Sequence, residues 1–143
     1  MVTQDSRRKK NNILFRCDAT PAVALGHLKR CLTLADVFRA SGWGVVFVVA
    51  QDSSAEENLR QSRYPFSVVQ SGANALEDYR LTEQTAQRYD TSIVVIDQYS
   101  IDNAYRRKLK DCGLMLVSLT DSPYTTIASH IVVSGTISDQ ANA

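Results

Sequence analysis

The sequence predicts an α/β domain with one parallel sheet and helices on both of its faces. Two observations carry this prediction. Short apolar runs alternate with stretches whose apolar residues recur at helical spacing along most of the 143 residues. The runs VVFVVA and SIVVI are continuously apolar and rich in β-branched residues, which is typical of strands buried on both faces of a parallel sheet. We therefore expect a Rossmann-like sheet of about five or six strands.

The first half of the chain alternates regularly between strands and helices. Residues 13–17 (ILFRC) form an apolar run and are predicted to be the first strand. Residues 26–41 are predicted to be a helix because apolar side chains recur in them three and four positions apart, with a glycine as the stop. Residues 45–50 form the second strand. Residues 53–61 form a short helix with Ser53 or Ser54 as its N-cap and acidic residues in its first turn.

The second half continues the same alternation. Residues 66–70 are the third strand, and residues 76–89 form a polar helix. Residues 92–96 (SIVVI) are the clearest strand, and residues 102–112 form a helix with an apolar stripe that a glycine ends. The sheet is completed by two further strands, at residues 114–119 and 131–134.

The composition is that of an ordinary globular domain, with 44% hydrophobic and 22% charged residues. The net charge of +1 gives no electrostatic reason to expect nucleic acid or an anionic membrane as a partner, and no segment is long and apolar enough to span a membrane. We expect one domain over residues 13–135, a disordered tail over residues 1–12, and a frayed end or the start of a linker over residues 136–143.

The cysteines and histidines argue against a metal centre. The three cysteines include no CxxC pair, and the two histidines are far apart in the sequence. No close spacing of these residues resembles a zinc site. We therefore expect reduced thiols in a cytoplasmic protein, with neither a metal nor a cofactor.

Three loops leave the carboxyl ends of predicted strands with polar residues. They cover residues 18–27, 97–100 and 120–123. Ligands of open α/β sheets bind beyond the carboxyl ends of the strands, so we expect the three loops to meet in one crevice. The candidate substrate contacts in these loops are Asp18, Gly26, Asp97, Tyr99 and Asp121.

His27 stands where the first helix begins, directly after Gly26. Glycine lets the backbone approach a ligand closely, and the start of a helix offers free N–H groups and the positive end of its dipole. That dipole disfavours an imidazolium, and a neutral imidazole can act as a general base near neutral pH. The spacing equally allows a histidine that only caps the helix or hydrogen-bonds a neighbouring loop.

The other candidate site residues could also have purely structural roles. Asp97 could hold a loop by accepting backbone hydrogen bonds, Tyr99 could be a packing aromatic, and Asp121 could form a turn before a proline. The two arginines near the first loop, Arg16 and Arg30, are expected to form ion pairs rather than to contact substrate. The expected partner of each is Asp18 or Asp36.

The stretch FRCDATPAVALGHLKRCLTLAD resembles the N-terminal signature of the UDP-sugar hydrolases of pseudaminic acid biosynthesis and of the related spore-coat polysaccharide proteins. That signature is roughly FRxDSSxxIGxGHxxRCLxLA. IDQYSID is similar to the family's strand followed by Asp-x-Tyr, and SLTDSP to its strand followed by Asp-Asp, with Thr120 departing. The likeness runs from Ile13 to about Ser134. The signature positions that match are Phe15, Arg16, Asp18, Gly26, His27, Arg30, Cys31, Leu32, Leu34 and Ala35.

The resemblance implies a two-domain fold like that of the GT-B glycosyltransferases, of which this chain is the N-terminal half. Members of the family hydrolyse the anomeric C–O bond of a UDP-linked 2,4-diacetamido-trideoxy sugar and release UDP. By this resemblance His27 is the catalytic base that activates water, and Tyr99 lines the sugar pocket. The implied partner is a UDP-linked amino sugar.

Two departures from the family pattern bear on this function. Ala24 replaces the first glycine of GxGH, and its methyl group is expected to alter the loop. The sequence also stops where the family's C-terminal domain begins, and that domain carries most of the nucleotide-binding surface. We therefore expect little or no activity from this chain alone, and a separate C-terminal domain or a homo-oligomer as its complement.

Two other functions stay open. The chain could be the acceptor-side half of a glycosyltransferase of similar fold, in which His27 would deprotonate an acceptor hydroxyl instead of water. It could also be a non-catalytic binding or assembly module. An exposed apolar patch beside His27 would favour a partner domain, whereas a fully polar edge would favour a free-standing module.

Overall fold

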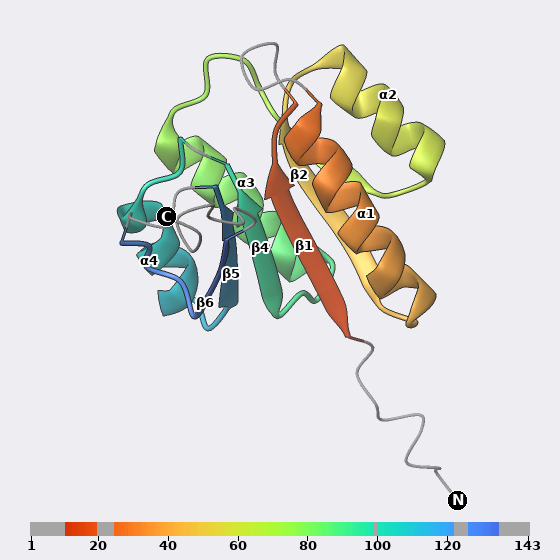
Figure 1. Ribbon diagram of the computed structural model, residues 1–143. Coiled ribbons are helices and arrows are strands. Elements are labelled where there is room, and N and C mark those ends of the chain that lie inside the picture. Colours follow the sequence, from red (N-terminus) through yellow and green to blue (C-terminus); the bar gives the residue numbers. More distant parts are fainter. Residues whose placement is uncertain (1–10, 20–24, 99, 122–125, 135–143) are drawn as a thin grey trace, which may run out of the picture.

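The chain forms a six-stranded sheet flanked by helices (Figure 1). The computed structural model describes residues 11–19, 25–98, 100–121 and 126–134. The strand order is β3-β2-β1-β4-β5-β6, and every neighbouring pair is parallel. The predicted α/β class, with a Rossmann-like parallel sheet and helices on both faces, is confirmed.

Every predicted strand and helix is present, and each end lies within one residue of its prediction. The strands are β1 (Asn12–Cys17), β2 (Gly44–Ala50), β3 (Phe66–Val69), β4 (Ile93–Asp97), β5 (Met115–Thr120) and β6 (Ile131–Ser134). The helices are α1 (Gly26–Ala40), α2 (Ser53–Ser62), α3 (Ala75–Arg88) and α4 (Asn103–Asp111). None of the helices in the described ranges is long and apolar enough to cross a membrane.

The N-cap of α2 differs from the prediction, because it is Asp52 and not Ser53 or Ser54. The Asp52 carboxylate accepts a hydrogen bond from the N–H of Ala55 at 2.8 Å, and its backbone is extended, with φ at −161°. A carboxylate at this position also interacts favourably with the positive end of the helix dipole, which a serine hydroxyl does not. Ser53 is therefore the first residue inside the helix.

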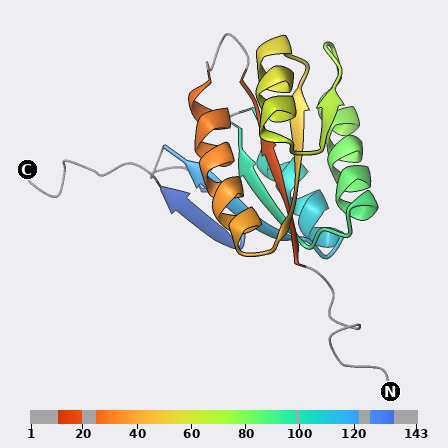
Figure 2. The same cartoon turned by 90° about the vertical axis from the view of Figure 1, so that its right-hand side faces the viewer.

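Each face of the sheet carries its own apolar core. Helices α1 and α2 cover one face, which Figure 2 looks onto, and α3 and α4 cover the other (Figures 1 and 2). Alternate residues of one strand serve the two cores: Phe15 of β1 packs under α1 and α2, and Leu14 packs under α3 and α4. Strands β1 and β4 lie side by side at the centre of the sheet.

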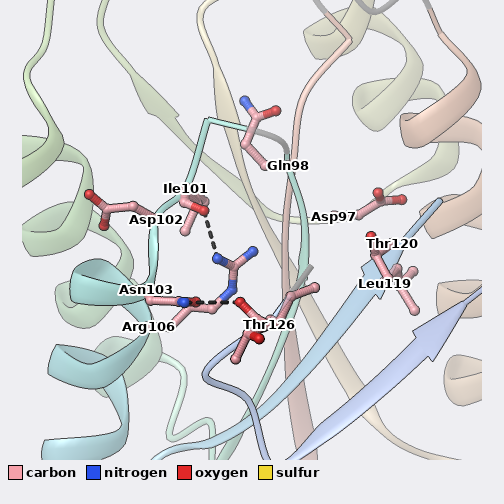
Figure 3. Close-up of a pocket in the computed structure, with 10 residues that line it drawn as sticks. Asp97, Gln98, Ile101, Asp102, Asn103, Arg106, Leu119, Thr120 and Thr126 are labelled. Atoms are coloured by element: carbon pink, nitrogen blue, oxygen red, sulfur yellow. Dashed lines mark hydrogen bonds between the residues drawn. The ribbon is translucent and has the colours of Figure 1, made fainter. Parts of the chain in front are cut away.

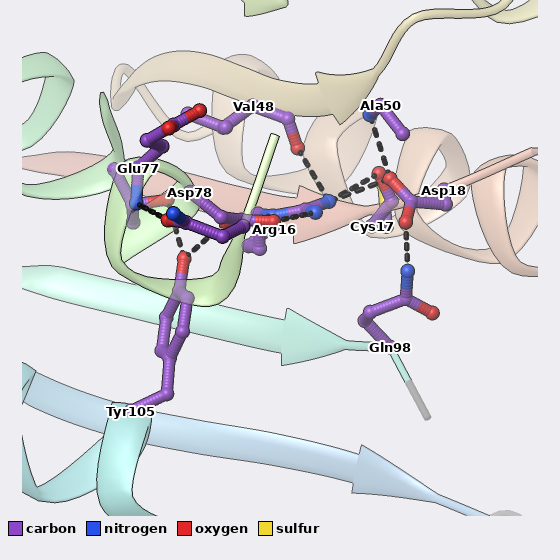
Figure 4. A network of polar contacts seen from close by, with 11 residues as sticks. Arg16, Cys17, Asp18, Val48, Ala50, Glu77, Asp78, Gln98 and Tyr105 are labelled. Carbon is purple, nitrogen blue, oxygen red and sulfur yellow. Dashed lines mark hydrogen bonds and ion pairs between the residues drawn. The ribbon is translucent and has the colours of Figure 1, made fainter. Parts of the chain in front are cut away.

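A buried arginine links β1 to helices α3 and α4 (Figure 4). The guanidinium of Arg16 is 2.6 Å from carboxylate oxygens of both Asp18 and Asp78, and the hydroxyl of Tyr105 donates to Asp78 at 2.6 Å. Burial alone would lower the pKa of Arg16, but the two carboxylates raise it above its ordinary value. The ion pair predicted between Arg16 and Asp18 is confirmed, and it is part of the core.

Candidate active site

The sheet reverses its strand order between β1 and β4, which is where ligands of open α/β sheets bind. Asp18 follows β1 directly, Asp97 is the last residue of β4, and Asp121 follows β5 directly. Helix α1 begins at Gly26 after the loop that leaves β1. The carboxyl ends of the parallel strands therefore bring the described candidate residues to one edge. Tyr99 lies outside the described residues.

The central feature of this edge is a contact between Asp97 and His27. Nδ1 of the imidazole is 2.7 Å from Oδ1 of Asp97. Asp97 is 2% exposed, and the His27 side chain is 14% exposed. An ionised carboxylate can only accept, so we assign the proton of this bond to Nδ1. In the neutral ring Nε2 then carries the lone pair, which is the form that a general base requires.

Arg30 and Cys31 hold the same carboxylate from the next turn of α1. The guanidinium of Arg30 donates to both oxygens of Asp97, from Nε at 2.8 Å and from Nη2 at 2.6 Å. The thiol of Cys31 donates to Oδ2 at 3.7 Å. Hydrogen bonding to Asp97 raises the pKa of Arg30 above its ordinary value, so its charge is permanent. Asp97 is thus fixed and its negative charge is compensated.

Arg30 also links this carboxylate to the third loop. Its Nη1 donates to Oδ1 of Asp121 at 3.0 Å, and the Asp121 side chain is 45% exposed. The predicted pairing of Arg30 with Asp18 or Asp36 is therefore wrong. Asp18 instead forms an ion pair with the buried Arg16. Asp36 pairs with Arg39, three positions further along the outer surface of α1.

Asp18 is buried and bonded within the protein. It is 2% exposed and accepts from Arg16, from the N–H of Ala50 at 2.7 Å, and from the side-chain amide of Gln98 (Figure 4). It thereby joins β1, β2 and the loop after β4. A methyl group at Gly26 would meet no atom of the described residues within 4 Å, its chain neighbours and the backbone of α1 apart. Substrate contact by either residue stays a prediction.

A pocket of about 350 Å³ lies on the α4 side of Asp97 (Figure 3). Its walls come from the end of β4, the start of α4 and the end of β5. Its lining includes Asp97, Gln98, Ile101, Arg106, Leu119 and Thr120. The sequence interpretation missed Arg106, although the position directly follows Tyr105 of the apolar stripe and so borders the buried face of α4.

An apolar surface lies on the other side of the site. Arg30 forms one wall of a hollow that is otherwise lined by Thr33, Leu34, Leu119 and Val133. The neighbouring side chains of β6 are 45–48% exposed. Exposed apolar side chains therefore gather beside Arg30.

Comparison with solved structures identifies a structural relative of the chain. No family model matches the chain, and no curated protein matches it. A solved glycosyltransferase from Rickettsia africae ESF-5 is similar over 83% of this chain, with a TM-score of 0.58 and 15% identity. The aligned region covers 32% of that glycosyltransferase. At this identity the likeness concerns the fold alone: the described chain has a glycosyltransferase-like α/β fold that spans about a third of the relative.

Proposed function

We propose that this chain is the acceptor-side half of a nucleotide-sugar-dependent glycosyltransferase, with His27 as its general base. The observation that carries the proposal is the 2.7 Å contact between Nδ1 of His27 and the buried carboxylate of Asp97, at the switch point of the sheet. It leaves Nε2 as the proton acceptor. The glycosyltransferase-like fold supports the same function at the level of architecture.

In this mechanism Nε2 of His27 takes the proton of an acceptor hydroxyl as its oxygen attacks the anomeric carbon of the donor sugar. The new C–O bond forms while the bond from that carbon to the nucleotide phosphate breaks. The bonding electrons leave with the nucleoside diphosphate, which is a good leaving group and needs little acid assistance. A positioned general base contributes on the order of 10²–10⁴-fold to such a step.

Hydrolysis of a UDP-linked amino sugar is the second candidate. It uses the same base with water in place of the acceptor hydroxyl. It is favoured by the match of Gly26-His27, Asp97-x-Tyr99 and Asp121 to the hydrolase family described above. Transfer and hydrolysis therefore differ in the hydroxyl that gives its proton to Nε2, and they can be separated by their products.

The test supplies the chain with UDP-linked sugars and a nucleotide-binding domain, on the same polypeptide or a separate one. Glycosyl transfer predicts UDP release that depends on an added sugar acceptor and yields a glycosylated product. Hydrolysis predicts UDP and free sugar without an acceptor. Sugar binding with no UDP release in either arm would reject both enzymatic functions and leave the binding module.

His27→Asn should lower turnover on the order of 10²–10⁴-fold, because the base is lost while much of the size and hydrogen bonding is kept. The melting temperature should change little. His130→Asn is the matched control, since Nδ1 of His130 only accepts the N–H of Leu116, at 3.0 Å, far from this edge. It should leave turnover per folded molecule unchanged. Unchanged turnover in His27→Asn would rule out the role assigned to His27.

A further inference from the structure

Arg106 is a buried cation in the wall of the pocket beside Asp97. It is 8% exposed. Its Nη1 donates to the carbonyl oxygen of Ile101 at 2.7 Å, and its Nε donates to Oγ of Ser118 at 3.2 Å. These two bonds fix the plane of the guanidinium, and in Figure 3 the group projects between the start of α4 and the end of β5.

Arg106 differs from the other inward-facing arginines in lacking a carboxylate partner. Arg16 and Arg30 each form ion pairs with two aspartates, whereas Arg106 forms none with any described residue. Burial lowers the pKa of Arg106, and the nearby charge of Asp102 only partly opposes this. A buried charge without a partner is unfavourable, so its presence calls for a compensating group from outside the chain.

The third nitrogen of this guanidinium, Nη2, remains for that group. Within the described ranges, Oγ1 of Thr91 is the one sealed side-chain polar atom that lacks a hydrogen-bond partner. Nη2 of Arg106 is therefore not sealed in the core and can be reached from the pocket. The site thus offers one fixed, planar donor group, and the pocket volume of about 350 Å³ falls within the range of small-molecule sites.

Two aspartates line this pocket, but the carboxylate of Asp97 is turned away from it, toward α1. Asp97 is already compensated by the bidentate contact with Arg30. Asp102 is the N-cap of α4 and accepts from the N–H of Tyr105 at 2.9 Å. A phosphate carries about −1.5 to −2 charges and would be repelled by Asp102. A carboxylate carries one charge and matches the planar fork of an arginine.

We propose that this pocket binds an acidic sugar, with the sugar's carboxylate on Arg106. Asp97 contributes to the pocket wall, and its carboxylate contacts His27, so the pocket adjoins the candidate site. The identity of the ligand as a sugar rests on the proposed function. The carboxylate on that sugar then makes the acceptor a uronic-acid-type sugar. That the pocket takes a carboxylate rests on Arg106 alone.

The test measures binding by calorimetry on the full chain, without turnover. Methyl β-D-glucuronide and methyl β-D-glucoside differ only in a carboxylate against a hydroxymethyl group. We expect the glucuronide to bind at least about tenfold more tightly, as a hydrogen-bonded charge contact predicts. Arg106→Met should abolish this preference, and Arg106→Lys should keep part of it. Arg107→Met, at the exposed neighbouring position, is the matched control and should change nothing.

A second variant keeps Arg106 in place. Thr126 is an exposed residue of the pocket lining, and Thr126→Glu should supply the missing carboxylate from within the chain. We expect a higher melting temperature and loss of glucuronide binding. Equal affinity for the two glycosides, or tighter binding of inorganic phosphate, would overturn the proposal. His27→Asn should retain glucuronide binding, so a failure of the catalytic role and a failure of this site give different results.

Discussion

Asp97 organises the candidate site, because its one carboxylate meets three side chains of α1. It accepts from His27, Arg30 and Cys31 and is itself 2% exposed. The contact to the imidazole sets the tautomer, and the contact to the guanidinium compensates the charge. We therefore regard Asp97 as a positioning residue, which acts through His27 and does not need to touch the substrate itself.

The reactivity of the Cys31 thiol reports how tightly α1 packs on Asp97. A hydrogen bond with Cys17 and burial raise the pKa of Cys31 well above its ordinary value. Since the thiolate is the reactive form, iodoacetamide should modify the exposed Cys112 in the native protein and leave the two buried cysteines intact. Mass spectrometry of the peptides tests this. All three should react in urea, and native-state reaction of Cys31 as fast as Cys112 would contradict the packing described here.

The sequence predicted which described residues reach the edge of the sheet, but not how they pair. Asp18, Asp97 and Asp121 could be found because each stands at or just after the end of an apolar run. The partners of Arg30 could not be found, because side chains 67 and 91 positions away meet it only once the strand order is known. Arg106 was missed because a charged residue beside an apolar stripe normally points to solvent.

At the scale of elements, α1 carries the site because of its helical spacing. His27, Arg30 and Cys31 are three and four positions apart, so they share one face and point to the end of β4. On the opposite face of the sheet, α3 and α4 meet through Asp78, which accepts from both Arg16 of β1 and Tyr105 of α4. The two layers of helices are thus each tied to the central strands by a polar contact.

The contact between Tyr105 and Asp78 depends on pH. It is 4% exposed, and burial together with the charge of Asp78 raises its pKa above the ordinary value. The native state therefore keeps the phenol proton at pH values where the unfolded chain, with a tyrosine pKa of about 10, loses it. This stabilisation is complete below pH about 10 and declines as the pH rises from there, by up to about 1.4 kcal/mol per pH unit.

Tyr105→Phe removes that contribution. We expect a loss of about 1–3 kcal/mol of unfolding free energy at neutral pH, because Asp78 loses a hydrogen bond. Between pH about 9.5 and 11 the free energy of unfolding in urea should fall less steeply for the variant than for the wild type. Tyr64 and Tyr79 also have raised pKa values, so some slope should remain. Equal slopes in the two proteins would show that Tyr105 titrates alike in the folded and unfolded states.

At the scale of the whole molecule, the order of the strands creates the site. Placing β4 beside β1 brings the end of one next to the loop that leaves the other, although 80 residues separate Asp18 from Gln98. Apolar runs and helical spacing predicted each element, because those signals are local. They could not predict which strands are neighbours, because strand pairing depends on the packing of both helical layers at once.

The strand order also predicts that stability is unevenly distributed over the sheet. β1 and β4 pair on both sides, and their side chains are almost entirely buried. β6 lies at one edge of the sheet, pairs with β5 alone in the described part of the chain, and exposes all of its residues. We therefore expect the amides of β1 and β4 to exchange hydrogen only through global unfolding. Those of β6 should exchange through a local opening of lower free energy, measured by hydrogen exchange in increasing urea.

Two valine variants separate local from global opening. Val132 of β6 is 46% exposed and Val94 of β4 is fully buried. Val94→Ala should cost roughly 2 kcal/mol, from about 0.8 kcal/mol for each buried methyl group and a further amount for the cavity. It should lower protection in β1 and β4 by that amount. Val132→Ala should leave protection there unchanged and speed exchange in β6 only. Equal protection of β6 and β1 in the wild type would mean that the sheet opens as a single unit, including its exposed edge.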